Sequence, residues 1–464
     1  MFYITLFAVV LALAAFVWLG LRARTRTGEL DDYLTARDSQ GAVTLGLSFL
    51  ASGMGAWILF APPEVGAFVG PVALAGYAVG AAAPFLVFAL CGPAIRRRLP
   101  RGQSIGEFTK HCYGNGVRRW VSLISALYML CFLAAELTAI GAIAVMLSGI
   151  PGAVAIVGVA AATLVYTTLG GLRASLVTDR WQAWLLIALL VLVGVVAVKL
   201  HPAVTFRAPL PEVPARRALS AALALVIAVT AANLFHQGYW QRIWAARDAG
   251  TLGRGALIGA LVTVPVVAAV GGFGMLAAMA GVPLGDPPIP FFALLDGAPA
   301  WLAPAALVLA VTLVASSVDT LQNGIASLLT TEGPSGRASL TTARIVTVLL
   351  MVPVVVVALQ GLSVLRLFLI ADLLCATMVA PVLLGLWPRM SASAAAAGGI
   401  AGLVGAVLPG WVSAGSLEAG IVAASFPGGV PTLGPFAGAL SMSIAVSALA
   451  ALLFPRAVDG PRSA

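Results

Sequence analysis

Residues 46–66 read GLSFLASGMGAWILFAPPEVG, and the interpretation of the whole chain starts from this stretch. It lies in a hydrophobic run long enough to cross a bilayer, yet Gly53 and Gly55 stand in its middle and Pro62 and Pro63 near its end. Glycine weakens a helix by about 1 kcal/mol relative to alanine, and proline removes a backbone donor. A helix broken inside a membrane exposes carbonyl oxygens, which are tolerated only where something satisfies them. The stretch therefore predicts the first half of an ion and solute site.

The composition is that of a protein embedded in a lipid bilayer. Hydrophobic residues make up 61% of the chain and charged residues 9%, whereas a soluble domain carries about 25% charged residues. The net charge of +9 comes mainly from short basic loops between apolar runs, which is a signal of membrane orientation. We therefore expect the lipid bilayer as a partner and no nucleic acid. Nothing in the pattern predicts an oligomeric state.

Thirteen apolar runs are long enough to cross a membrane, which predicts an all-α polytopic membrane protein with about 13 transmembrane helices. The runs fall at 2–22, 42–68, 71–95, 118–148, 152–170, 176–200, 218–246, 255–280, 299–331, 341–360, 363–387, 393–409 and 435–454. Lys and Arg concentrate in every second loop, so we expect an integral cell-membrane protein with its N-terminus outside and its C-terminus in the cytoplasm.

The thirteen runs can be grouped into an internal repeat, with runs two to six as one unit of five helices and runs seven to eleven as the next. Transporters often repeat a helical unit in inverted topology, with a discontinuous helix opening each unit. Because five is odd, a second unit of five helices enters the membrane upside down, and its first helix, 218–246, should also be interrupted. That run carries the polar segment NLFHQGYW at 233–240, as expected for a break. The expected regions are an N-terminal helix and loop (1–40), a first repeat (41–200), a second repeat (201–390) and two C-terminal helices with the tail (391–464).

Four acidic residues within or beside the apolar runs each require a physical reason. A charged side chain at the bilayer centre costs about 2.5–3.5 kcal/mol on insertion scales. Glu136 lies in mid-span and Asp179 at the inner start of the sixth run, and either is a functional group or a partner of a neighbouring side chain. Asp319, near the inner end of the ninth run, is expected to be solvated or paired. Asp372 has no predicted role.

Ser316 and Ser317 are adjacent hydroxyls on the otherwise apolar ninth run. Isolated serines in membrane helices often bond back to the preceding turn, which is one interpretation of this pair. The other is a cation site, because hard cations take oxygen ligands and a broken helix supplies more of them. His236 has a similar pair of interpretations, as a buried packing residue or as part of the predicted break.

Four stretches together resemble the sodium/solute symporter family. They are ASGMGAW at 51–57, YTTLGGLRASLVTDRWQ at 166–182, GYWQRIWAARD at 238–248 and ASSVDT at 315–320, of which the second is the most specific. The resemblance covers essentially the whole chain. It implies a LeuT-like fold, with a five-plus-five inverted repeat, one extra N-terminal helix and two extra C-terminal helices.

The resemblance also implies where a sodium ion and a solute would bind. The sodium ligands would be the backbone carbonyls of Ala51, Met54 and Leu313 and the hydroxyls of Ser316 and Ser317. Asp179 matches the family's carboxylate near the inner sodium exit, where some members hold a second ion. The solute would lie between the two breaks, near Gly53, Trp57, Glu136, His236, Gln237 and Trp240. Gly53 stands where several amino-acid transporters of the family have an acidic residue, so their mechanism does not carry over directly.

The predicted function is sodium-coupled symport of a small polar organic solute by alternating access. Proton coupling through Glu136 or Asp179 is one alternative, and a transporter-like solute sensor is another. The chain has no HExxH motif, no GxSxG at a strand–helix turn, no phosphate-binding loop and no recognisable nucleophile–base pair, so we do not expect an enzyme. The sequence leaves open whether the solute is an amino acid, a carboxylate, urea or a sugar.

Overall fold

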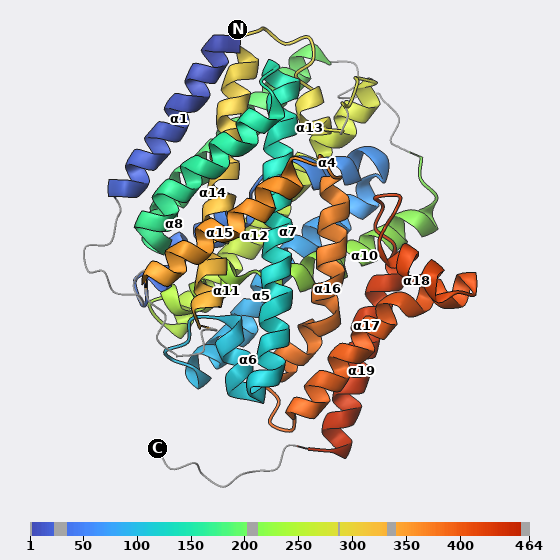
Figure 1. The fold of residues 1–464 in the computed structure, drawn as a ribbon. Helices are drawn as coiled ribbons and strands as arrows, with labels where there is room; N and C mark the ends of the chain where they lie inside the picture. Colours follow the sequence, from blue (N-terminus) through green and yellow to red (C-terminus); the bar gives the residue numbers. More distant parts are fainter. Residues whose placement is uncertain (1, 23–34, 202–211, 286–287, 332–339, 456–464) are drawn as a thin grey trace.

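The structure is a computed structural model that describes residues 2–22, 35–201, 212–285, 288–331 and 340–455 (Figure 1). Within these ranges the side chains of residues 20, 52, 170, 171, 173–183, 330, 331, 340 and 343 lie outside the described set, and the predicted ion-exit residue Asp179 is among them. The helices are α1 (Phe2–Arg22), α3 (Ala42–Gly53), α4 (Trp57–Phe68), α5 (Pro71–Arg98), α6 (Ile105–Tyr113), α7 (Asn115–Ser148), α8 (Gly152–Leu200), α10 (Ala215–Leu234), α11 (Gln237–Ala245), α12 (Ala249–Ala280), α13 (Pro290–Ala293), α14 (Leu302–Thr331), α15 (Leu340–Ala358), α16 (Val364–Leu384), α17 (Ala392–Ala414), α18 (Leu417–Ala424) and α19 (Leu433–Leu453).

Both predicted helix interruptions are present. The first separates α3 from α4, where Met54 leaves the helical region with φ −106° and ψ 70°. The second separates α10 from α11, where His236 adopts φ −72° and ψ 102°. Pro62 and Pro63 lie inside α4, so they do not mark the break. The first break follows the glycine-rich segment instead, since glycine is the weakest helix former after proline.

The helices form two packed groups. We call α3/α4, α5, α10/α11 and α12 the bundle, because these helices pack mainly on one another. We call α7, α8, α14 and α15 the scaffold for the same reason. Figure 1 shows α7 running through the middle of the molecule, where it borders both groups. The two broken helices therefore lie together in the bundle and face one central scaffold helix.

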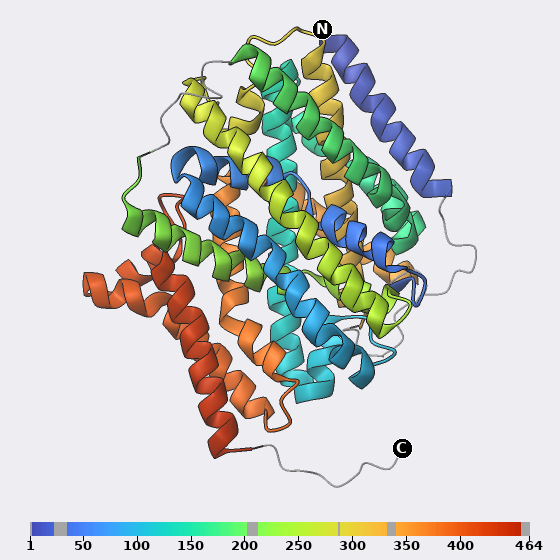
Figure 2. The ribbon, with the colours of Figure 1, turned by 180° about the vertical axis from the view of Figure 1, so that it is seen from behind.

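The order of elements is repeated along the chain. A broken helix opens each half, a long helix follows, and a short helix (α6 or α13) precedes the third long helix (α7 or α14). This order matches the predicted repeat, whose exact boundaries stay a prediction. The peripheral helices flank this repeat, with α1 against α8 and α14, and with α17, α18 and α19 on the opposite side near α16 (Figures 1 and 2).

The runs 152–170 and 176–200 both lie within α8, which spans Gly152–Leu200. Two apolar segments are found in it, Gly152–Leu169 and Trp184–Leu200, one for each predicted run. The boundary between the two runs stays a prediction, since the side chains of residues 173–183 lie outside the described set.

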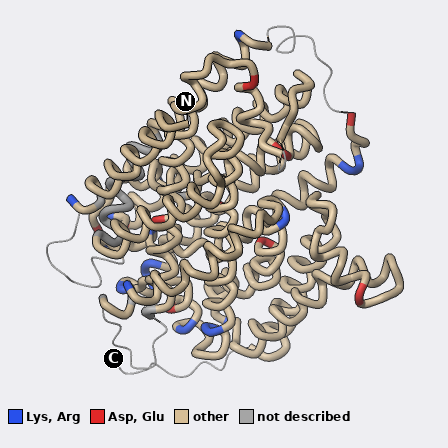
Figure 3. Tube along the Cα trace, turned by 45° about the horizontal axis from the view of Figure 1, so that its top comes forward, with Lys and Arg blue, Asp and Glu red and all other residues tan. Residues whose placement is uncertain are grey.

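Ten helices in the described part of the chain are long and apolar enough to cross a membrane. Three shorter apolar helices, at Ala42–Ala51, Trp184–Leu200 and Arg344–Ala358, accompany them. Each of the predicted runs contains one of these segments, while the count of thirteen crossings is not confirmed. Figure 3 shows several Lys and Arg residues gathered in the lower left part of the view. The protein is an integral membrane protein, and its orientation stays a prediction.

Candidate functional site

The first break is closed by a side chain from the scaffold. Glu136 on α7 is fully buried, and its Oε2 accepts a hydrogen bond from the Ala56 N–H at 2.5 Å and its Oε1 one from the Trp57 N–H at 3.3 Å. These are the free donors at the N-terminus of α4, which have no partner within the helix. A Cβ on Gly55 would overlap both Glu136 and Ser317, so the break admits the Glu136 side chain only because residue 55 is glycine.

The carbonyl side of the first break is partly occupied as well. The Met54 N–H donates to the Ala51 carbonyl at 3.1 Å, and the Trp57 indole N–H donates to the Gly53 carbonyl. A carbonyl oxygen has two lone pairs, so each can accept a further partner. A Cβ on Gly53 would overlap the Tyr239 hydroxyl, which shows that α11 of the second break packs directly against the first.

Ser317 on α14 faces the first break from the scaffold. Its Oγ lies against Gly55 and near the Glu136 carboxyl, without hydrogen-bond geometry to any described group. Leu313 and Ser316 are buried on the same helix, four residues and one residue before Ser317 in the sequence. The structure therefore brings Ser317 to the first break, while the ligand roles of Leu313, Ser316 and Ser317 stay predictions.

Polar side chains of the second break form hydrogen bonds that hold the break in place. The Gln237 amide accepts from the Ile105 N–H at 3.0 Å and donates to the Gln103 carbonyl at 2.7 Å and to Ser327 Oγ at 3.2 Å. The Trp240 indole N–H donates to the Leu234 carbonyl at 2.7 Å. These contacts tie the break to its surroundings, and the solute role expected for Gln237 and Trp240 stays a prediction.

His236 lies at the second break with its imidazole among aromatic rings. It is fully buried and stacks on Tyr239 with a centroid separation of 4.5 Å, while Tyr128 and Phe132 meet it edge-on at 6.3 and 5.9 Å. Neither ring nitrogen has a hydrogen-bond partner among the described residues. Its position agrees with the predicted break, and its polar atoms are left for a ligand or for water.

A small aromatic pocket lies between the two breaks. It is a cavity of about 20 Å³, which holds about one water molecule, and we call it the aromatic pocket. Its lining consists of Trp57, Tyr77, Tyr128, Phe132, Val229, Ala232, Asn233, Phe368 and Asp372. The Trp57 and Tyr77 rings stack at 5.7 Å with an interplanar angle of 13°. The pocket therefore combines aromatic faces with one carboxyl group.

Only part of this pocket was predicted from the sequence. Trp57 belongs to the predicted solute site, whereas Asp372 had no predicted role. It missed Tyr77 and Tyr128, although tyrosines in mid-membrane segments are a usable signal because their hydroxyls need partners there. Of the two alternatives predicted for Asp319, the structure shows pairing, since the residue is fully buried and accepts a hydrogen bond from the Tyr166 hydroxyl at 2.9 Å.

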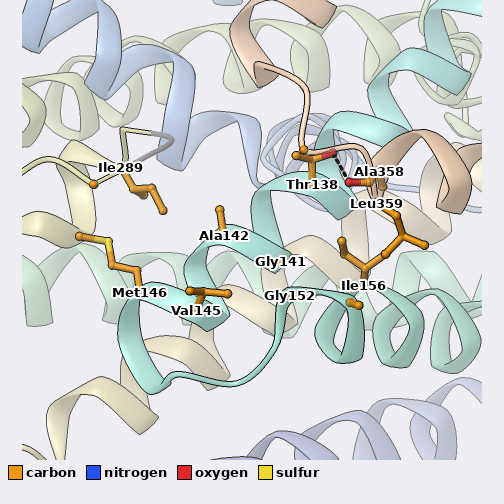
Figure 4. A pocket seen from close by; sticks show the side chains of 13 residues that line it. Thr138, Gly141, Ala142, Val145, Met146, Gly152, Ile156, Ile289, Ala358 and Leu359 are labelled. Atoms are coloured by element: carbon orange, nitrogen blue, oxygen red, sulfur yellow. Dashed lines mark hydrogen bonds between the residues drawn. The ribbon is translucent and has the colours of Figure 1, made fainter.

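Larger cavities lie elsewhere. Figure 4 shows one of about 440 Å³ between α7, α8 and α15, with aliphatic side chains around it and the Thr138–Ala358 hydrogen bond at its edge. Its lining carries no charged group, so it does not suit a polar solute.

A second cavity of about 540 Å³ is lined by Glu64 on α4 and by residues at the start of α16, and we call it the vestibule. Both α4 and α16 also line the aromatic pocket, although the two cavities share no lining residue.

The opposite end of the bundle is fastened by arginines. Arg37 donates to the Pro100 carbonyl at 2.9 Å, and Arg96 donates to the Ile243 carbonyl at 3.1 Å. Arg98 donates to the carbonyls of Gly385 and Leu386 at 2.9 and 2.7 Å. These contacts tie the α5 end of the bundle to neighbouring segments through backbone carbonyls.

Comparisons with known proteins agree with this architecture. The model of the sodium:solute symporter family matches residues 33–208. The spermidine transporter of Candida albicans is 29% identical over 367 residues, which cover 76% of this chain and 69% of that protein.

Solved transporter structures share the fold. A Na⁺-coupled sialic acid symporter in a substrate-bound outward-open state superposes with a TM-score of 0.75 at 16% identity, over 97% of this chain and 98% of its own. A nucleobase-cation-symport-1 family transporter in a closed conformation superposes with a TM-score of 0.60 at 16% identity, over 93% and 97%. The protein is thus a membrane transporter rather than an enzyme, and its resemblance to the sodium/solute symporter family, with a LeuT-like fold, is confirmed.

Proposed function

We propose that the protein is a sodium-coupled secondary transporter that carries a small organic amine by alternating access. The observation that carries this proposal is the aromatic pocket, which lies between the two broken helices and contains the Asp372 carboxyl group. At about 20 Å³ the pocket is closed around about one water molecule, so an amine can bind only if the pocket widens when the bundle moves. A pocket at the junction of two discontinuous helices is where secondary transporters of inverted-repeat architecture bind their solutes.

The chemistry of the pocket favours a cation. Aromatic faces attract ammonium groups, by about 0.5–2 kcal/mol for each well-placed ring. Asp372 is 6% exposed and forms no ion pair in the part of the chain that the structure describes. A buried carboxyl group requires a cation or a proton as partner, and an amine solute would supply one. The similarity to a spermidine transporter supports the same class of solute.

Sodium would bind where α3 ends and α14 faces it. The proposed ligands are the carbonyls of Ala51, Met54 and Leu313 and the hydroxyls of Ser316 and Ser317. An ion there would join the bundle to the scaffold and favour the conformation that also binds solute, because coupling requires both ligands to prefer the same state. We propose that the ion then leaves past Asp179 when the bundle tilts.

Uptake into proteoliposomes tests the proposal. Labelled spermidine should accumulate with an inward sodium gradient and not with an equal potassium gradient. The double variant Ser316→Ala with Ser317→Ala should need about tenfold more sodium for half-maximal uptake, since it loses two ligand oxygens. Spermidine uptake of equal rate in sodium and potassium would refute sodium coupling, and unchanged sodium dependence in the double variant would remove the site assignment.

Proton coupling is the second candidate, because Glu136 is a fully buried carboxyl group that joins α7 to α4. A proton on Glu136 would weaken its bonds to the break and so affect the contact between scaffold and bundle. Uptake driven by an inward proton gradient in sodium-free buffer would favour this mechanism over the first.

A further inference from the structure

The N-terminus of α4 has the features of an anion site. Free N–H groups and the helix dipole both favour negative charge at such an end, and broken transporter helices use it to hold anionic solute groups. Here the Ala56 and Trp57 N–H groups already bind the Glu136 carboxyl at 2.5 and 3.3 Å. The anion position of the first break is therefore filled from within the protein.

We propose that Glu136 is a specificity-determining residue that excludes solutes bearing a carboxylate from the first break and so leaves the site selective for amines. The effect of Glu136 on uptake rests on the transport function proposed above. Its effect on ligand binding can be measured without transport. Removing the Glu136 side chain should turn the break into a site that accepts an external carboxylate.

The position of Glu136 relative to the pocket supports this role. Tyr128, Phe132 and Glu136 are four residues apart along α7, so they lie on one face of the helix, and the first two line the aromatic pocket. Trp57 also joins the two places, because its ring lines the pocket while its backbone N–H bonds Glu136. A solute in the pocket therefore lies next to the filled anion position.

Steric contacts prevent a solute from sharing that position. Even one methyl group on Gly55 would overlap the Glu136 carboxyl and the Ser317 side chain. Glu136 and Ser317 are both fully buried. A solute carboxylate could reach the Ala56 and Trp57 N–H groups only by displacing the Glu136 carboxyl, which occupies both.

Three ligands with the same four-carbon skeleton test the wild-type preference. They are 1,4-diaminobutane, 4-aminobutanoate and succinate, and binding is followed by the shift in Tm of the purified protein at constant sodium. A ligand that binds the native state raises Tm by mass action. We expect the diamine to bind at least about tenfold more tightly than 4-aminobutanoate, and succinate to produce no shift. Equal shifts from diamine and succinate would overturn the proposal.

The second arm uses Glu136→Ala, which removes the atoms of one acetate molecule. Acetate should restore part of the lost Tm in this variant, and the preference for diamine over 4-aminobutanoate should fall by about tenfold or more. Sodium chloride at equal ionic strength should restore nothing. The matched control is Ser125→Ala, because Ser125 lies on the same face of α7 but donates to a carbonyl, so acetate should not rescue it.

The outcomes separate this inference from the proposed function. If Glu136→Ala does not yield folded protein, Glu136→Ser replaces it, because its shorter side chain also vacates the anion position, and the diamine preference should again fall. Variants that keep the full wild-type preference would refute the role of Glu136 even if sodium-driven uptake is found. The converse result is that acetate rescues the Tm of Glu136→Ala while the wild-type protein shows no sodium-driven uptake. That pair of results would support the role of Glu136 and refute the proposed transport mechanism.

Discussion

The two helix breaks are bound to the same scaffold helix in opposite ways. Ser125 and Glu136 lie 11 residues apart on α7, which is about three helical turns, so both project from one face. Glu136 accepts hydrogen bonds from the N-terminal end of α4, whereas the Ser125 hydroxyl donates to the Phe235 carbonyl at the end of α10 at 2.7 Å. Each α7 side chain thus matches the polarity of the helix end that it meets.

This difference indicates where the bundle is held most firmly. A carboxyl group that accepts backbone N–H bonds at a helix N-terminus makes a stronger contact than a neutral hydroxyl on a carbonyl. The second break also has a bond of its own within the bundle, between the Trp240 indole and the Leu234 carbonyl. We expect changes at the first break to affect stability and transport more than equivalent changes at the second.

The largest effect should follow from Glu136→Ala. The variant leaves two buried N–H groups without their acceptor and opens a cavity, which should lower the free energy of unfolding by about 2–4 kcal/mol. Thermal unfolding of purified protein in detergent measures this. Glu418→Ala, at an exposed position on α18, is the control and should change Tm little. A loss below that of Ser125→Ala would contradict the comparison of the breaks.

Gly55→Ala and Gly238→Ala together compare how much room for a methyl group each break offers. A Cβ at Gly55 would overlap Ser317 and Glu136, so Gly55→Ala should cost about 1–3 kcal/mol and abolish uptake. A Cβ at Gly238 would meet the Thr320 methyl carbon at 2.8 Å and a His236 ring carbon at 2.9 Å, both on side chains that can shift. Gly238→Ala should therefore retain more uptake, as measured in the proteoliposome assay. The opposite order would show that the second break is the tighter one.

Asp372→Asn tests the pocket between the breaks. The substitution keeps the shape of the side chain and removes its charge, so KM for an amine should rise about tenfold while Tm changes little. Initial uptake rates over a range of spermidine concentrations give KM. An unchanged KM would place the amine elsewhere, and Glu64→Gln in the vestibule would then be the next variant to measure.

The smallest effect is expected for Ser125→Ala. It removes one neutral hydrogen bond to the Phe235 carbonyl, which should cost about 0.5–1.5 kcal/mol. Chemical denaturation or a Tm measurement is adequate to detect it. A loss of unfolding free energy as large as that of Glu136→Ala would mean that α7 holds both breaks equally firmly.

The sequence predicted the breaks because the signal for each is local. Gly53 and Gly55 weaken the first helix, and the polar segment around His236 marks the second, so both stand out within apolar runs. The runs 152–170 and 176–200 are local signals of the same kind, and both recur as apolar segments of α8, Gly152–Leu169 and Trp184–Leu200. The role of Asp372 could not be predicted in this way, because the side chains around its carboxyl group come from other helices.

The sequence by itself determined the membrane class, the transporter family resemblance and the two interrupted helices, because these follow from hydropathy and short-range backbone preferences. Only the tertiary structure decided that Glu136 binds the Ala56 and Trp57 N–H groups, about 80 residues earlier in the chain. It also decided that Asp372 joins Tyr77 and Tyr128 in one pocket. Partners so distant in sequence depend on how the bundle packs against the scaffold, and no local pattern records that packing.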